Sequence, residues 1–352
     1  RTLVFPQRIE LHMTERYNLS TDFLAAAGWS DAVRAPLAGD ASNRRYERLQ
    51  AADGSPAVLM DAPPEKGEDV RPFVAIAEYL TSLGLSAPHI LAADPEHGFL
   101  LLEDLGDDLF ARVVLSAPAL ETELYTAATD VLLALHSHTP PQSLAPYDAP
   151  VMADMAALAY RWYGAQETGS MAAQSEAFHT AFQALLNAHI PDQTVLIQRD
   201  YHAENLLWLP TRIGPARVGL LDFQDAMLGH PAYDLVSLLQ DARRDVPPAI
   251  EQKMLAHYIN KSRHDETEFH AAYALLGAQR NLRIIGVFAR LSLLAGKPHY
   301  VDFIPRVWDY LMRDLEHPLL SDIRTQLLAD LPAPSEALLT ELKAKCGTLQ
   351  TL

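Results

Sequence analysis

The chain has 352 residues, of which 49% are hydrophobic, so it can build a complete core. It carries 28 basic and 45 acidic residues, and the formal net charge of −17 argues against binding to nucleic acid or to anionic lipid. A single cysteine, Cys346, excludes an internal disulfide and argues against a cysteine-based zinc site. No apolar run reaches the ~18 residues of a membrane span and no signal peptide is recognised, so the expected location is cytoplasmic.

The first third of the chain is predicted to be rich in β-strands. Residues 1–20 are treated as an N-terminal extension, because the first methionine is Met13 and the opening dozen residues could belong to another domain. The elements that follow are recognised by apolar spacing and by Gly and Pro at their ends. In chain order they are a helix at Thr21–Ala27, a turn between two strands within Pro36–Leu49, a strand at Ala57–Met60, a helix at Pro72–Leu83, a strand near Ile90 and a buried strand that runs into a linker at Gly98–Gly106.

After Asp107 the pattern becomes mostly helical. Amphipathic helices are predicted at Glu121–His138 and Ser175–Leu186, and one helix after another is predicted from Tyr233 onward. Two short apolar strands, Thr194–Ile197 and Val218–Leu221, are expected to form a hairpin-like pair. The predicted fold is α+β with two lobes: a β-rich, nucleotide-binding N-lobe at 21–106 and a mostly helical C-lobe at 107–352.

Three polar residues follow these two short strands in a pattern that fits phosphoryl transfer. Asp200 and Asn205 lie five residues apart after the first strand, and Asp222 follows the second. Phosphoryl transfer needs one carboxylate to orient and deprotonate the attacking hydroxyl. It also needs an amide oxygen and a second carboxylate to hold Mg²⁺ on the ATP phosphates. We therefore expect one of the two acids to be the catalytic base and the other, with Asn205, to be a metal ligand.

The segment resembles the catalytic loop of the protein-kinase-like fold, in the form found in aminoglycoside phosphotransferases and choline kinases. The family's Asp-x-x-x-x-Asn matches Asp200 and Asn205, and its metal-binding Asp matches Asp222. The resemblance therefore implies that Asp200 is the catalytic base and that Asn205 and Asp222 are the metal ligands. Arg199, which precedes the base, is grouped with it as catalytic. The later Pro-x-x-Asp-Leu matches Pro231 to Leu235, and by analogy Asp234 holds the catalytic loop through backbone N–H groups. The resemblance covers roughly Leu37 to Met312 and implies an ATP- and Mg²⁺-dependent kinase.

Two departures from the family pattern concern the catalytic loop and the nucleotide site. Gln198 stands where a His is usual, and no phosphate-binding lysine lies near Met60. Lys66 or an arginine of the preceding hairpin (Arg44, Arg45 or Arg48) is expected to supply the missing charge. The residues expected to bind the nucleotide are Asp40, Ser42, Arg44, Lys66 and the linker residues Glu103, Asp104 and Leu105.

A narrower resemblance concerns the acceptor. Gly39–Ser42, Leu59–Glu65 and Gly296–Tyr300 look like the anomeric amino-sugar kinases, which phosphorylate the 1-hydroxyl of N-acetylmuramate and N-acetylglucosamine in bacterial cell-wall recycling. A sugar site needs flat apolar faces and hydrogen-bonding groups. The residues expected to contact the substrate are His202, Glu204, Trp162, Tyr163 and Arg283, although helix packing explains the Trp-Tyr pair about as well.

Two other functions remain open from the sequence. An aminoglycoside, choline-like or other alcohol kinase would use the same catalytic residues, and its cationic substrates would suit an acidic protein. A pseudokinase, which binds nucleotide without turnover, is favoured only by Gln198 and the missing lysine. In each case the expected ligands are small molecules, and the sequence does not specify an oligomeric state.

Overall fold

The computed structural model describes the backbone of residues 5–37, 43–165 and 171–348, which divides into two compact units. Unit 1 comprises Arg1–Asp108 and Leu206–Asp225, and unit 2 comprises Leu109–Asn205 and Ala226–Leu352. The segment Leu206–Asp225 was expected in the C-lobe, but its contacts make it part of unit 1. The first segment of unit 1 ends at Asp108, close to the lobe boundary predicted after residue 106.

Unit 1 is built on an antiparallel sheet of five strands in the order β1-β2-β3-β5-β4. The strands are β1 (Val33–Leu37), β2 (Arg45–Gln50), β3 (Pro56–Asp61), β4 (Ile90–Asp94) and β5 (Phe99–Glu103). The turn into β5 requires glycine, because Gly98 has φ +74° and a Cβ there would collide with the backbone of Ala62. This turn fixes the register in which β5 enters the sheet between β3 and β4.

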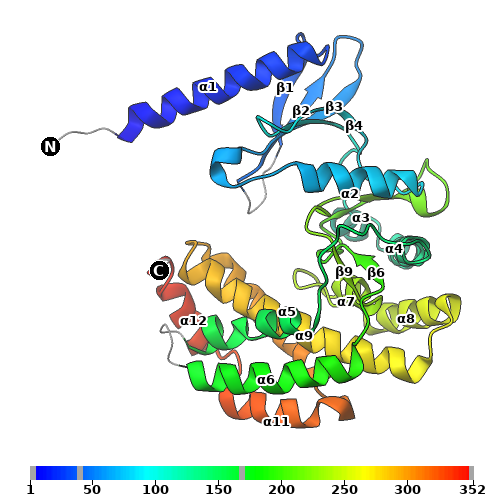
Figure 1. Cartoon of the computed structure of the whole chain (residues 1–352), viewed down its shortest axis with the longest axis vertical. Helices are drawn as coiled ribbons and strands as arrows, with labels where there is room; N and C mark the ends of the chain where they lie inside the picture. Colours follow the sequence, from blue (N-terminus) through cyan, green and yellow to red (C-terminus); the bar gives the residue numbers. More distant parts are fainter. Residues whose placement is uncertain (1–4, 38–42, 166–170, 349–352) are drawn as a thin grey trace. The chain divides into compact units, whose positions relative to one another are not determined.

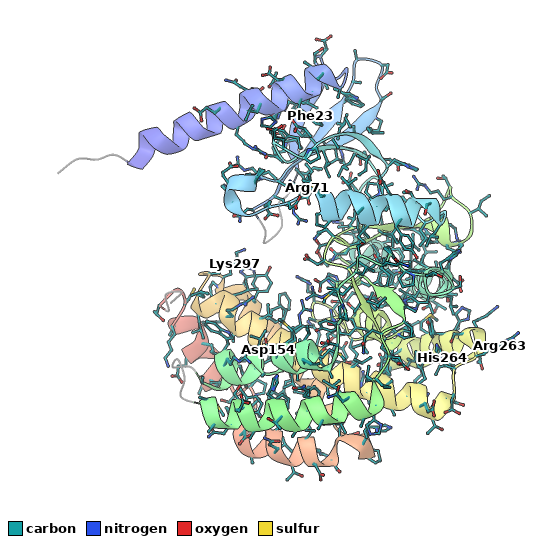
Figure 2. All side chains as sticks on the ribbon, in the orientation of Figure 1. Phe23, Arg71, Asp154, Arg263, His264 and Lys297 are labelled. Carbon is teal, nitrogen blue, oxygen red and sulfur yellow. The ribbon has the colours of Figure 1, made fainter. Side chains whose placement is uncertain are left out.

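The C-terminal end of helix α1 (Phe5–Ala26) lies beside this sheet, as Figure 1 shows. Phe23 of α1 lies against the sheet (Figure 2) and stacks on Phe99 with ring centroids 5.7 Å apart. Arg16 on the same helix pairs with Asp61 of β3 at 2.6 Å. The helix therefore runs through the expected boundary at residue 20, and its second half belongs to the core of unit 1.

The other segments of unit 1 are helix α2 (Arg71–Ser82) and the strands β7 (Leu206–Trp208) and β8 (Val218–Leu220). The helix predicted at Pro72–Leu83 is confirmed, with Pro72 in its first turn, where a missing N–H has no cost. Phe73 of α2 packs on Phe223 with ring centroids 4.7 Å apart. This contact anchors the segment that follows β8, which carries Asp222.

Unit 2 is mostly helical and is organised around one long buried helix, α9. Its helices are α3 (Phe110–Ser116), α4 (Glu121–His136), α5 (Ala149–Ala156), α6 (Ala172–His189), α7 (Ala232–Leu239), α8 (Pro248–Ser262), α9 (Glu266–Leu293), α10 (Ile304–Asp314), α11 (Ser321–Asp330) and α12 (Glu336–Ala344). Helix α9 contacts α5, α7, α10 and α12 (Figure 1). Because α9 is enclosed in this way, polar side chains on it are buried next to the catalytic loop.

The short strands of the catalytic region pair differently from the expected hairpin. In the described ranges, β6 (Val195–Ile197) pairs with β9 (Met227–Gly229) in unit 2, whereas β7 pairs with β8 in unit 1. The prediction that β6 and β8 pair with each other was therefore wrong. All four strands are only three residues long, and apolar runs this short indicated β6 and β8 but neither β7 and β9 nor the pairing of the strands. No helix in the described ranges has both the length and the hydropathy that a bilayer span requires.

Candidate active site

The catalytic loop of unit 2 follows β6 and has a strained backbone. Arg199 has φ +71°, a left-handed conformation that costs a non-glycine residue about 1–2 kcal/mol. Asn205 closes the loop by donating from Nδ2 to the carbonyl oxygen of Asp200 at 2.9 Å. The amide oxygen of Asn205 thus has a fixed orientation, and the Asp200 carboxylate is presented from a rigid turn.

Asp234 holds this loop from the first turn of α7. Its two carboxylate oxygens accept from the backbone N–H groups of Gln198 at 2.7 Å and of Arg199 at 2.9 Å. Ser237 adds a hydrogen bond from Oγ to the carbonyl oxygen of Arg199 at 3.2 Å. Complete burial raises the pKa of Asp234 to about 7, against the effect of the two N–H donors. Each carboxylate oxygen of Asp234 faces an N–H donor, and a proton on either oxygen would compete with that hydrogen bond. The Asp234 carboxyl is therefore ionised when both hydrogen bonds are made.

Asp200 lies beside cationic side chains from α9. Arg283 Nη1 is 3.9 Å from Asp200 Oδ1, too long for a hydrogen bond but close enough for a strong electrostatic interaction. Burial raises the pKa of Asp200, but nearby cationic groups, Arg283 foremost among them, lower it, and the net shift is downward. The Asp200 side chain is 35% exposed, so an ionised carboxylate is accessible to an acceptor hydroxyl.

Arg280, one turn before Arg283, is 2% exposed. Its Nε and Nη1 atoms have no hydrogen-bond acceptor in the described part of the chain, although it interacts electrostatically with Asp200 and Asp241. A buried guanidinium with unsatisfied donors is costly, so such a group typically binds an anion or water. Sequence analysis placed Arg283 but not Arg280 in the site, since burial of Arg280 depends on the helices packed around α9.

His202 is buried next to these arginines and is neutral. Burial lowers its pKa to about 4. Its Nε2 lies 3.1 Å from Arg243 Nη1 and 3.5 Å from Asn205 Nδ2, both of which can only donate, so Nε2 accepts and Nδ1 carries the proton. This Nδ1 is also buried without a hydrogen-bond acceptor among the described residues. His202 therefore supports the loop from inside unit 2, through its contacts with Arg243 and Asn205.

Unit 1 contains a cavity of about 460 Å³ that is lined by Arg44, Gly67, Glu68, Asp69, Pro72, Asp222, Gln224 and Asp225. Asp222 has φ +57°, the second strained residue among those predicted to be functional. Its Oδ1 accepts from Gln224 Nε2 at 2.7 Å. The following Phe223 is buried, so packing and hydrogen bonding together fix the carboxylate toward the cavity wall.

The linker residues of unit 1 have their side chains engaged with arginines. Glu103 pairs with Arg212 at 2.5 Å, and Asp104 pairs with Arg48 at 2.7 Å. The Asp104 carboxylate also accepts from the N–H of Gly106 at 2.9 Å. The linker side chains are therefore held in place by ion pairs within unit 1.

The other predicted site residues differ in their surroundings. Asp40 and Ser42 lie outside the described residues. Lys66 and Glu204 are exposed, and Trp162 is half-buried. Tyr163 is fully buried, donates from its hydroxyl to the carbonyl oxygen of Pro332 at 2.7 Å and packs on Trp308. Tyr163 therefore stabilises the core of unit 2, and we do not retain it as a substrate contact.

Two residues that sequence analysis missed are Glu68 and Arg243. Glu68 binds Arg44, and Arg243 binds His202. Neither residue belongs to the motifs that identify the catalytic loop, and each contact joins segments more than 20 residues apart. Only the folded chain reveals them.

Comparison with known proteins places this site in a family. The model of the phosphotransferase enzyme family matches residues 33–273. N-acetylmuramate/N-acetylglucosamine kinase from Caulobacter vibrioides is 42% identical, over 88% of this chain and 95% of that protein. The kinase of the same name from Pseudomonas aeruginosa is 35% identical, over 90% of this chain and 94% of that protein.

Solved structures with the same fold have much lower sequence identity. Choline kinase from Streptococcus pneumoniae superposes with a TM-score of 0.59 at 15% identity, over 86% of this chain and 99% of that chain. An amicoumacin kinase superposes with a TM-score of 0.60 at 13% identity, over 88% of this chain and 96% of that chain. The fold is therefore the α+β, bilobal protein-kinase-like fold. The chain belongs to the phosphotransferase enzyme family and is an ATP-dependent kinase that acts on a hydroxyl group.

Proposed function

We propose that the chain transfers the γ-phosphoryl group of ATP to the anomeric 1-hydroxyl of N-acetylmuramate and N-acetylglucosamine. The observation that carries this proposal is the 42% identity to a kinase of that name, over 95% of that protein's length. The resemblance to the amino-sugar kinases of cell-wall recycling agrees with it. Because the donor is ATP, we also propose that the enzyme works in the cytoplasm.

Asp200 would act on the acceptor. Its carboxylate accepts a hydrogen bond from the 1-hydroxyl, orients the oxygen for in-line attack and takes the proton as the O–P bond forms. The lowered pKa makes Asp200 a weak base. A weak base suffices, because the transition state is loose and an anomeric hydroxyl is more acidic than an ordinary alcohol. Positioning by the rigid loop then contributes more than basicity.

Asn205 and Asp222 would hold Mg²⁺ on the ATP phosphates. Their amide and carboxylate oxygens are the hard ligands that Mg²⁺ prefers, and the ion would neutralise charge on the transferring phosphoryl group. In the described residues, no group of three or more His, Cys, Asp or Glu side chains could hold a metal by itself. That is compatible with an ion bound mainly by nucleotide oxygens and water. We also propose that backbone groups of Glu103–Leu105 bind the adenine base.

Arg283 would bind the acidic side group of the acceptor. N-acetylmuramate carries a lactyl carboxylate that N-acetylglucosamine lacks, and Arg283 and Arg280 place two positive charges beside Asp200. A polycationic aminoglycoside or choline would meet these charges at the point where its hydroxyl must react. The electrostatics of unit 2 therefore support an anionic or neutral sugar.

The proposal can be tested by locating the transferred phosphate. The enzyme is incubated with Mg²⁺ and ATP and, in separate reactions, with N-acetylmuramate, N-acetylglucosamine, glucose or kanamycin, and the products are analysed by phosphorus NMR. We expect a 1-phosphate on both N-acetylated sugars and little product with the other two. Phosphate on kanamycin or on a sugar 6-hydroxyl would contradict the acceptor assignment and leave the kinase assignment intact.

A further inference from the structure

The nucleotide site of this chain lacks the lysine that kinases place on the third strand of the sheet. In protein kinases, that lysine contacts the nucleotide phosphates while a glutamate from a nearby helix binds it as an ion pair. Here the corresponding strand is β3, and the residue near the expected position is Met60. Met60 is 1% exposed and lies opposite Tyr46 of β2. An apolar side chain thus occupies this position, and the charge must come from elsewhere.

The register of the sheet places Arg44 next to this position. Side chains two residues apart along a strand share one face of a sheet. Arg44 is the residue immediately before β2, and Arg45 lies opposite Asp61. Continued by one residue, the alternation of β2 places Arg44 on the face that Met60 and Tyr46 share, one step beyond Met60. A guanidinium at the start of the neighbouring strand can therefore reach the space where a β3 lysine would end.

Glu68 binds the Arg44 side chain in a fixed position. Arg44 Nε donates to Glu68 Oε2 at 2.9 Å, and the other carboxylate oxygen accepts from the backbone N–H of Asn43 at 3.2 Å. Both side chains are largely buried, with exposed fractions of 13% and 12%. Glu68 lies three residues before α2, so the pair links the start of β2 to the start of the helix. The pair is comparable to the lysine–glutamate pair of protein kinases in joining a cation to a carboxylate, but the cation precedes β2 and the carboxylate precedes the helix.

The cavity of unit 1 brings this pair together with Asp222. Of the eight residues that line it, all within the described ranges, four are acidic (Glu68, Asp69, Asp222 and Asp225) and one, Arg44, is cationic. Such a surface would repel a triphosphate unless a divalent cation covers Asp222 and a fixed positive charge offsets the remaining carboxylates. Arg44 is the side chain in the cavity wall that provides this charge.

The other candidate cations in unit 1 are unsuitable. Lys66 and Arg45 are exposed and do not line the cavity. Arg48 is engaged with Asp104 at 2.7 Å and with Asp107 at 2.7 Å. Of the cations that sequence analysis proposed, Arg44 alone is both buried in an ion pair and part of the cavity wall.

We propose that Arg44, oriented by Glu68, is the residue that binds the nucleotide phosphates in place of the missing β3 lysine. The inference rests on the nucleotide half of the proposed function and not on the identity of the acceptor. Arginine presents a planar fork of N–H donors, which suits phosphate oxygens better than the single ammonium group of lysine.

The test measures nucleotide binding without an acceptor. Isothermal titration calorimetry gives the Kd of Mg-ATP and of adenosine for wild type, for Arg44→Gln and for Arg44→Lys. A matched control, Arg45→Gln, removes the adjacent exposed charge. We expect Arg44→Gln to weaken Mg-ATP binding by about 10- to 100-fold, the loss for one charged hydrogen-bonding group, and to leave adenosine binding unchanged. Arg44→Lys should retain part of the affinity, and Arg45→Gln should bind like wild type.

Two results would overturn the inference. One is an Arg44→Gln protein that binds Mg-ATP within roughly twofold of wild type, and the other is an equal loss of adenosine affinity. Urea unfolding checks that each variant is folded. If Arg44→Gln does not fold, the Glu68→Gln variant provides the test. This variant keeps the Arg44 charge but removes the carboxylate that orients it, so an Mg-ATP affinity equal to that of wild type would refute the role of the pair. Failure of the sugar assay would not affect these binding measurements.

Discussion

Replacing Asp234 by Asn tests whether the strained catalytic loop depends on one buried carboxylate. Asp234 accepts two backbone N–H groups, one on each oxygen. Asn has one carbonyl oxygen, and its NH₂ group would face an N–H donor. The variant therefore loses a charge-assisted hydrogen bond and leaves donors buried without acceptors. Each of these effects costs about 1–3 kcal/mol, so we expect the free energy of unfolding to fall by about 3–5 kcal/mol.

The same substitution should affect turnover more than nucleotide binding. Arg199 keeps φ +71° while Asp234 and Ser237 bind it, and without the carboxylate the loop can relax and move Asp200. A small displacement of a positioned catalytic group costs about 10²-fold in rate. Mg-ADP affinity should fall less than kcat, because Arg44 and Asp222 belong to the other unit and only Asn205, the second proposed metal ligand, lies on the loop.

Three measurements check this prediction: urea unfolding followed by tryptophan fluorescence, kcat at saturating Mg-ATP, and calorimetric titration with Mg-ADP. Ser237→Ala removes only one weak bond and should cost about 0.5–1.5 kcal/mol. Asp192→Asn makes the same chemical change at an exposed site in unit 2 and should have little effect. A folded Asp234→Asn protein with the stability and kcat of wild type would refute the reasoning.

The remaining predictions concern the reacting groups and pH. Asp200→Asn should lower kcat by about 10²–10⁴-fold and leave Mg-ADP affinity nearly unchanged, and an enzyme that keeps most of its activity would exclude Asp200 as the base. Asp222→Ala should weaken Mg-ATP binding and activity together, whereas an unchanged Mg²⁺ dependence of binding, measured by calorimetry, would exclude it as a ligand. Burial lowers the pKa of His230 to about 4, below its unfolded value near 6.5. The neutral histidine therefore stabilises the fold above pH 6.5, and this stabilisation is lost as pH falls toward 4. Urea unfolding between pH 7 and pH 4.5 should show a slope of about 1.4 kcal/mol per pH unit from this group, and His230→Gln should flatten it; an unaltered slope would contradict the assignment.

The parts of the fold that could be predicted are those whose signal is local. The helices at α2 and α4 have apolar spacing over several turns, and β5 is a continuous apolar run. The catalytic loop from Asp200 to Asn205 could be recognised because its signal is the type and order of residues within one loop. These features survive in the sequence because each requires particular neighbours within a few residues.

The parts that could not be predicted depend on contacts between distant segments. Arg44 and Glu68 are 24 residues apart, and nothing near either residue indicates their pairing. An arginine on a helix is usually exposed, but α9 is enclosed by other helices, and Arg280 is only 2% exposed. The left-handed backbone at Arg199 and Asp222 has no sequence signal, because neither residue is glycine.

The net charge of the chain is a poor guide to the charge of its ligands, because electrostatic selection is local. A formal charge of −17 is spread over 352 residues, and charges farther away than about 8 Å are largely screened at physiological salt. Within that distance of Asp200 lies the Arg283 guanidinium, and in the unit 1 cavity Arg44 lies among the carboxylates. Buried charges interact several times more strongly than exposed ones, so these arginines can outweigh the acidic surface at the two places where phosphate and acceptor are expected to bind. A variant that lacks Arg283 should therefore lose affinity for N-acetylmuramate but not for N-acetylglucosamine, since only the former carries a carboxylate. An equal loss for both sugars in Arg283→Gln kinetics would instead assign the arginine to the transferring phosphoryl group.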